Sequence, residues 1–166
     1  MKIISLALWA FILCCFLGCK EHKEDKEEII STVTFEKPEA PIFHKSHEPK
    51  KQDAPFSDVV QVGNMLYLSG QIGMDHYTRE LVEGGIEAET KQAFENIRDV
   101  LSVHGLNFKD VVKVTVILDD INDFKAFNDI YIQYLSHKPA RTTFAVEALA
   151  RGAKIEIEVV AVASKQ

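Results

Sequence analysis

Cysteine is scarce in this 166-residue chain, and its three cysteines, Cys14, Cys15 and Cys19, all lie near the amino terminus. The rest of the chain therefore cannot hold a disulfide framework or a cysteine-ligated zinc site. Basic residues are outnumbered as well, because 19 lysines and arginines face 25 aspartates and glutamates, for a net charge of −6. This acidic balance argues against a protein that binds nucleic acid through attraction to phosphates.

Several signatures of catalysis and ligand binding are also missing. The six histidines show no metal-ligand spacing within a regular element, so the sequence predicts no metal site. Ser69 lacks the Gly-x-Ser-x-Gly context of a hydrolase nucleophile, and the glycine pattern of a nucleotide-binding loop does not occur. What remains is a chain that is 46% hydrophobic and 27% charged, which fits one globular domain with an appendage.

The amino terminus has the pattern of an export signal. Lys2 precedes an uncharged, apolar stretch over residues 3–18 that is too short to span a membrane easily. Residues 1–18 are therefore expected to be a signal peptide. Their end, Phe16-Leu17-Gly18-Cys19, resembles a bacterial lipobox in which Cys19 accepts the lipid. This pattern predicts an exported, membrane-anchored lipoprotein in the periplasm or on the cell surface, with a plain cleaved signal or an uncleaved anchor as the alternatives.

A charged linker follows the signal. Eight of the nine residues 20–28 are charged, a composition that cannot bury a face. Prolines recur between residues 38 and 55 and exclude a long helix there. We expect residues 19–53 to be a flexible tether with a short strand near 41–44, and residues 54–166 to be the folded domain.

The folded part carries alternating and helical apolar patterns. They predict a ββ-α-β-α-ββ order, an α+β domain with a mixed sheet and both helices on one of its faces. The strand over 111–118 is apolar on both faces, which favours a second copy of the chain covering the open face. In chain order the predicted elements are strands over 59–62 and 65–69 joined by a Gly63-Asn64 turn, a helix with its buried face at Ile86, Thr90, Phe94, Ile97 and Leu101 that ends at Gly105, the strand 111–118, a helix with its inner face at Phe124, Phe127, Tyr131 and Tyr134, and strands over 142–146 and 154–163.

Two charged residues stand where they can carry chemistry. Arg141 follows Pro139-Ala140 at the entrance to a strand, where its planar guanidinium can grip a carboxylate; it can equally be a surface arginine paired with a neighbouring acid. Glu156 alternates with Ile155 and Ile157, so it points away from their side chains. It can act as a general base or orient a water, or simply belong to a solvated strand face.

Several stretches together resemble the RidA/YjgF family of reactive-intermediate deaminases. The resemblance covers residues 54–163 and rests on the order and spacing of its motifs rather than on any one of them. These motifs are Pro55-Phe56-Ser57, Leu68-Ser69-Gly70-Gln71-Ile72-Gly73, Val112-Lys113-Val114-Thr115-Val116, Phe127-Asn128-Asp129-Ile130-Tyr131, Pro139-Ala140-Arg141 and Ile155-Glu156-Ile157-Glu158.

The resemblance implies a chorismate-mutase-like fold assembled as a homotrimer, with ligand clefts between neighbouring subunits. It also implies hydrolysis of 2-imino acids, or their enamine tautomers, to 2-oxo acids and ammonia without a metal or organic cofactor. By position, Arg141 would bind the substrate carboxylate with help from the backbone near Gly70, and Glu156 would position or activate the attacking water. Ser69 and Asn128 would line the pocket.

Two positions depart from the pattern of the resembling deaminases. Phe56 stands where they commonly carry tyrosine, and Thr143 where they often carry cysteine, and both are expected to line the pocket. Two other functions stay open at this point. One is a trimer that binds a small carboxylate without turning it over. The other is RNA cleavage, an activity attributed to some relatives, against which the acidic charge counts.

Overall fold

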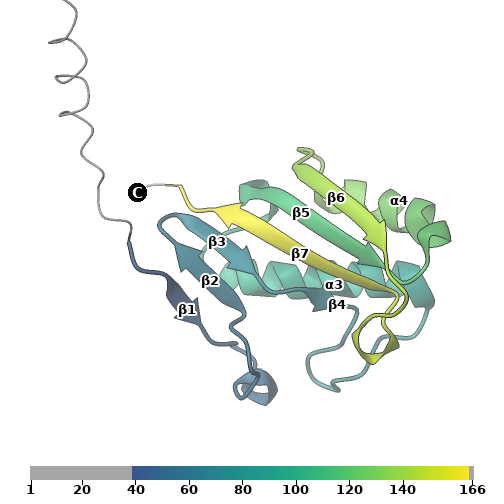
Figure 1. Cartoon of the computed structure of the whole chain (residues 1–166), viewed down its shortest axis with the longest axis horizontal. Helices are drawn as coiled ribbons and strands as arrows, with labels where there is room; N and C mark the ends of the chain where they lie inside the picture. Colours follow the sequence, from purple (N-terminus) through teal and green to yellow (C-terminus); the bar gives the residue numbers. More distant parts are fainter. Residues whose placement is uncertain (1–38, 165–166) are drawn as a thin grey trace, which may run out of the picture. The chain divides into compact units, whose positions relative to one another are not determined.

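The computed structural model describes residues 39–164 (Figure 1). The expected signal peptide over residues 1–18, its lipidation site Cys19 and the tether up to residue 38 lie outside the described residues. Within residues 39–164, no helix is both long enough and apolar enough to cross a membrane. The elements are β1 (Ile42–His44), η2 (Pro49–Lys51), β2 (Val59–Val62), β3 (Met65–Leu68), β4 (Gln71–Ile72), α3 (Gly85–Val103), η3 (Phe108–Asp110), β5 (Val111–Leu118), η4 (Ile121–Asp123), α4 (Phe124–Tyr134), β6 (Ala140–Ala145), η5 (Ala150–Gly152) and β7 (Ile155–Val162).

The strands form one mixed sheet. Its order is β1-β2-β3-β7-β5-β6, with β4 pairing separately with β7. Only the β5–β6 pair is parallel among the described pairings; the others are antiparallel. The predicted two-residue turn joins β2 to β3, because Val62 pairs with Met65 across Gly63-Asn64 and Gly63 adopts a φ of +58°. A left-handed backbone of this kind suits a tight hairpin turn.

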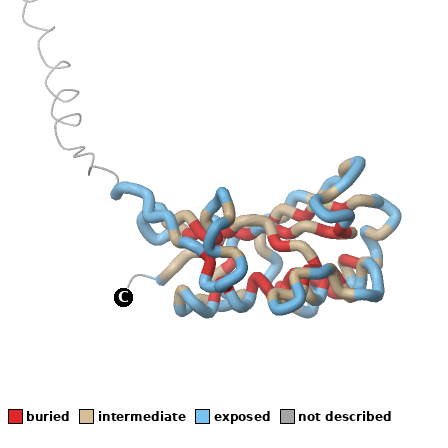
Figure 2. Tube along the Cα trace, turned by 90° about the horizontal axis from the view of Figure 1, so that it is seen from below, coloured by how far each residue is buried: buried red, intermediate tan, exposed pale blue. Residues whose placement is uncertain are grey.

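Both helices cover the same face of the sheet, as the apolar patterns predicted (Figure 1). Buried residues occur in both layers (Figure 2). Phe94 and Ile97 of α3 and Phe127 of α4 are fully buried in the cluster that also contains Ile155 and Ile157 of β7. The first helix ends as expected, since Gly105 has a φ of +70° and the Leu106 amide donates to the Leu101 carbonyl.

The compact unit begins at Glu39, earlier than the expected domain start at residue 54. Strand β1, at the place where a short strand was expected, pairs with β2 through Phe43 and Val60. Glu48, which follows β1, is buried, with only 5% of its surface exposed. The segment 45–53 is rich in charge and was expected to be tether. Two of its charged side chains, Glu48 and Lys51, are instead buried against opposite charges at Arg79 and Asp58, while Lys45, Lys50 and Asp53 are exposed.

Strand β5 is interior but is not covered on both faces within one chain. Val114, Val116 and Leu118 are completely buried on the helix side, whereas Val112 is 43% exposed at a bulge. The opposite face of the sheet, which we call the open face, exposes further large apolar side chains: Val62, Tyr67 and Phe144 are each about two-fifths exposed.

Candidate functional site

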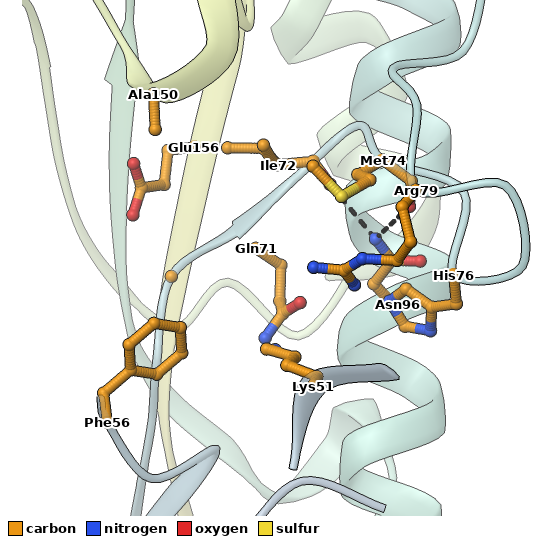
Figure 3. Close-up of a pocket in the computed structure, with 11 residues that line it drawn as sticks. Lys51, Phe56, Gln71, Ile72, Met74, His76, Arg79, Asn96, Ala150 and Glu156 are labelled. Atoms are coloured by element: carbon orange, nitrogen blue, oxygen red, sulfur yellow. Dashed lines mark hydrogen bonds between the residues drawn. The ribbon is translucent and has the colours of Figure 1, made fainter. Parts of the chain in front are cut away.

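A cavity of about 230 Å³ lies beside the strand end that carries Glu156 (Figure 3). Strand β7 supplies Glu156, and the short β4 places Ile72 opposite it in the ladder. The cavity therefore lies where the chain leaves the β2–β3 hairpin and β4 begins to pair with β7. Its lining residues are Lys51, Phe56, Gly70, Gln71, Ile72, Met74, His76, Arg79, Asn96, Ala150 and Glu156.

The Glu156 carboxyl group packs directly against Gly70. A Cβ atom at Gly70 would lie 2.8 Å from the Glu156 carboxyl carbon and 2.9 Å from its Cγ, and closer still to Oε1. These separations are below any carbon–carbon contact distance, so this approach requires a residue without a side chain. Burial, followed by the nearby Glu158 charge, raises the pKa of Glu156 above its ordinary 4.5. Such a carboxyl can hold or release a proton nearer to neutral pH than an exposed one.

Arg141 lies in a different hollow, a groove of about 590 Å³ beside α4. Its Nη1 donates a hydrogen bond to Asn128 Oδ1 at 2.9 Å. The guanidinium carbon lies 4.4 Å from the centre of the Tyr131 ring, a cation–π distance. Arg141, predicted as a carboxylate anchor with a paired surface arginine as the alternative, is therefore held in one orientation by contacts with α4. It lies inside β6, which begins at Ala140, rather than at the entrance to a strand starting at residue 142.

Arg141 and Glu156 lie on opposite faces of the sheet. In the β5 ladder Arg141 pairs with Val114, which is buried under the helices, and Glu156 pairs with Ile117 on the open face. Neighbouring partners in a ladder point to the same side, so one chain cannot direct both side chains into one cavity. The predicted site thus divides into two groups, Glu156 with Gly70 and Phe56, and Arg141 with Asn128.

The two remaining predicted site residues do not line either hollow. Ser69 Oγ donates to the Ser57 carbonyl at 2.7 Å, so its hydroxyl joins two loops. Thr143 pairs with Val116 and so shares the face of Arg141; its Oγ1 is buried and has no hydrogen-bond partner among the described residues. Within residues 39–164, no group of histidine, cysteine and acidic side chains is arranged to hold a metal ion.

The sequence reasoning missed three basic residues of the cavity: Lys51, His76 and Arg79. Lys51 was assigned to the tether, and the other two occur in a stretch without a pattern. Burial lowers the pKa of His76 below 6.5, against the opposing effect of the Glu48 charge. The imidazole is therefore neutral near pH 7, and the standing positive charges of the cavity are Lys51 and Arg79.

The profile of the endoribonuclease L-PSP family matches residues 46–163, most of the described chain and both groups of site residues. The chain belongs to this family. The L-PSP match begins inside the segment that was expected to be tether, in agreement with the compact unit that starts at Glu39.

Relatives of this L-PSP protein include deaminases. Human 2-iminobutanoate/2-iminopropanoate deaminase is 50% identical over 109 residues, which cover 65% of this chain and 80% of the human protein. Among solved structures, the Rid family protein YyfA of Yersinia pestis is 36% identical with a TM-score of 0.70, over 75% of this chain and all of YyfA. RidA from an Antarctic Psychrobacter is 40% identical with a TM-score of 0.64, over 67% of this chain and 90% of that protein.

Proposed function

We propose that this protein hydrolyses 2-imino acids, or their enamine tautomers, to 2-oxo acids and ammonia. The observation that carries the proposal is the Glu156 carboxyl, held against Gly70 in a cavity with its pKa raised by burial. No hydrogen bond within residues 39–164 occupies this carboxyl, so it is available to a water molecule. The sequence is 50% identical over 109 residues to a human protein named 2-iminobutanoate/2-iminopropanoate deaminase, and this similarity supports the same chemistry.

In the proposed reaction, the ionised Glu156 accepts a proton from water while the water oxygen bonds to the imine carbon. The electron pair of the C=N bond moves to nitrogen and gives a tetrahedral carbinolamine. With a protonated imine as substrate, Glu156 returns the proton to this nitrogen and makes it an ammonium group. The C–N bond then breaks with its electron pair on nitrogen, and ammonia leaves. The hydroxyl oxygen gives its proton to Glu156 as it becomes the carbonyl, and Glu156 releases that proton to solvent. Because an iminium carbon is already electrophilic, positioning of substrate and water supplies most of the catalysis.

Arg141 is the proposed anchor for the substrate carboxylate, in a cleft formed by two copies of the chain. Its location on the opposite face from Glu156 supports this assignment, because the two residues can meet only if Arg141 of one copy faces Glu156 of another. β6 ends the sheet, so its groove is accessible to a neighbour. The apolar open face supports a homotrimer, since exposed side chains such as Tyr67 and Phe144 gain cover there.

Export and lipidation are a second, separate proposal. The lipobox-like end at Cys19 and the charged residues after it support a membrane-anchored lipoprotein. Expression of the full-length chain in bacteria with labelled palmitate tests this: we expect label on the protein and none on Cys19→Ser. A label that survives the substitution would exclude Cys19 as the anchor.

The activity is tested by supplying the purified protein with 2-iminopropanoate or 2-iminobutanoate, formed in place by an amino-acid oxidase, and following loss of the imine. We expect acceleration that Arg141→Ala abolishes and Glu156→Gln reduces by about 100-fold or more. Arg98→Ala, an exposed arginine on α3, serves as the control. A wild-type rate equal to that of buffer, together with Arg141-dependent binding of 2-oxo acids, would show a binding module instead.

A further inference from the structure

The side of the Glu156 cavity that lies away from Glu156 is cationic. Figure 3 shows the Arg79 guanidinium directed into the cavity from the loop after β4, and Lys51 reaching it from η2. Of the charged side chains that line the cavity, Lys51 and Arg79 are positive and only Glu156 is negative. The charged hydrogen-bond donors that the cavity offers to a small anion are therefore those of Lys51 and Arg79, on the side away from Glu156.

Both cations are held from behind by buried acids that do not line the cavity. Arg79 Nη1 donates to Glu48 Oε2 at 3.0 Å, and Lys51 Nζ lies 2.7 Å from Asp58 Oδ1. The side chains of Glu48 and Asp58 are only 5% and 4% exposed. These contacts use one guanidinium donor and leave four, and the ammonium group likewise keeps donors free. The acids thus fix the two cations in place and leave hydrogen-bond donors for a ligand.

The backbone at Arg79 adds an independent observation. Arg79 adopts a φ of +65°, a left-handed conformation that is unfavourable for a residue with a side chain by about 1 kcal/mol or more. Glycine would remove this strain, so the conformation by itself gives no reason for arginine at this position. The Arg79 carbonyl also accepts a hydrogen bond from Arg151 Nη2 at 3.2 Å, which holds the turn in this shape.

We propose that Arg79 and Lys51 form a second anion subsite, which selects 2-imino and 2-oxo acids that carry another carboxylate on their side chain. This inference rests on the proposed function, in that it takes the Glu156 cavity as the place where the substrate binds. The 2-carboxylate goes to Arg141 of the neighbouring copy, and the side-chain carboxylate accepts hydrogen bonds from Arg79. The cavity has a volume of about 230 Å³, whereas a single water needs only roughly 10–15 Å³, so the cavity has room for more than one water.

Binding of the stable products tests the subsite without requiring turnover. Calorimetry on the full protein compares 2-oxoglutarate, which has the second carboxylate, with 2-oxobutanoate, which lacks it. We expect wild type to prefer 2-oxoglutarate by about tenfold or more, because a charge-assisted contact is gained. Arg79→Gly, which also relieves the backbone strain, should bring the ratio of the two affinities close to one, and Arg79→Lys should keep part of the preference.

Arg98→Ala is the control, because Arg98 is an exposed arginine of α3 that pairs with Glu95 and does not line the cavity. It should keep the preference of wild type. Equal affinities in wild type would overturn the subsite, as would a preference that survives Arg79→Gly. If that variant weakens both ligands by the same factor, Arg79 holds the shared 2-carboxylate and the selection of diacids is wrong.

Turnover separates this inference from the proposed function. The imines of alanine and glutamate are generated by oxidases and their decay is compared. We expect the glutamate-derived imine to be favoured by wild type and the ratio to fall in Arg79→Gly. If neither imine is turned over while 2-oxoglutarate is still preferred in an Arg79-dependent way, the deaminase function fails and the subsite stands. If both imines are turned over and the ratio is the same in the variant, the subsite fails and the deaminase stands.

Discussion

Gly70→Ala is expected to damage catalysis while leaving the fold intact. The added Cβ would lie 2.8 Å from the Glu156 carboxyl carbon, whereas carbon atoms make contact at about 3.5–4.0 Å, so the carboxyl group must move by roughly 1 Å. The colliding atoms are the end of a flexible side chain, and Gly70 does not have a positive φ, so the free energy of unfolding should change by no more than about 1 kcal/mol. A displacement of about 1 Å at a catalytic group costs on the order of 100-fold in rate, and we expect that loss in kcat/KM.

The assay is decay of 2-iminopropanoate, with denaturant unfolding measured on the same samples. Gly73→Ala provides the contrast, because its Cβ would meet the Cα of Glu89 in α3, and a packed helix cannot swing aside. That variant should lose about 1–3 kcal/mol of stability. Gly70→Ala combined with Glu156→Gln should be no slower than Glu156→Gln alone, since the alanine acts through Glu156. Full activity in Gly70→Ala, or additive losses in the double variant, would refute the role given to the Glu156 carboxyl.

Two further predictions concern Glu156 and the open face. Because burial raises the pKa of Glu156 above 4.5, the folded state keeps a proton that the unfolded chain releases, so stability should fall as pH rises from 4.5 through the folded pKa. Across the same window kcat/KM should rise as the base ionises, and Glu156→Gln should lose both effects in pH-dependent unfolding and rate profiles. Tyr67→Glu, on the open face, should reduce the proposed trimer to monomers in sedimentation experiments, whereas Tyr77→Glu, on a loop where the tyrosine is 87% exposed, should not. A trimer that survives Tyr67→Glu would exclude the open face as its interface.

Local signals in the sequence predicted the elements well. The Gly63-Asn64 turn and the end of α3 at Gly105 are set by backbone conformations that neighbouring residues determine. The alternation around Glu156 likewise placed its carboxyl opposite the buried Ile155 and Ile157. These features need no knowledge of distant contacts, which is why they could be derived from the chain alone.

The relation between the two groups of site residues could not be derived in this way. The face on which Arg141 lies depends on its register with Val114 in a parallel pair, and strand 111–118 is too uniformly apolar to reveal its own inner face. The prediction that the charged segment 45–53 belongs to the tether was wrong for another reason. Its composition predicts a solvated tether, but Glu48 and Lys51 become buried because Arg79 and Asp58, far away in the chain, supply the opposite charges.

The cationic wall of the cavity is built from parts that the sheet does not need. Lys51 belongs to a single helical turn before β2, and Arg79 to the loop between β4 and α3, and neither residue takes part in a strand pairing. Glu156 and Gly70, by contrast, lie in and beside the ladder of β4 and β7. The proposed substrate selectivity and the proposed bond-breaking chemistry thus depend on separable pieces of the chain. Exchanging the two surface segments between homologues would be a direct route to retuning which acids such a scaffold accepts, with the reacting carboxyl left untouched.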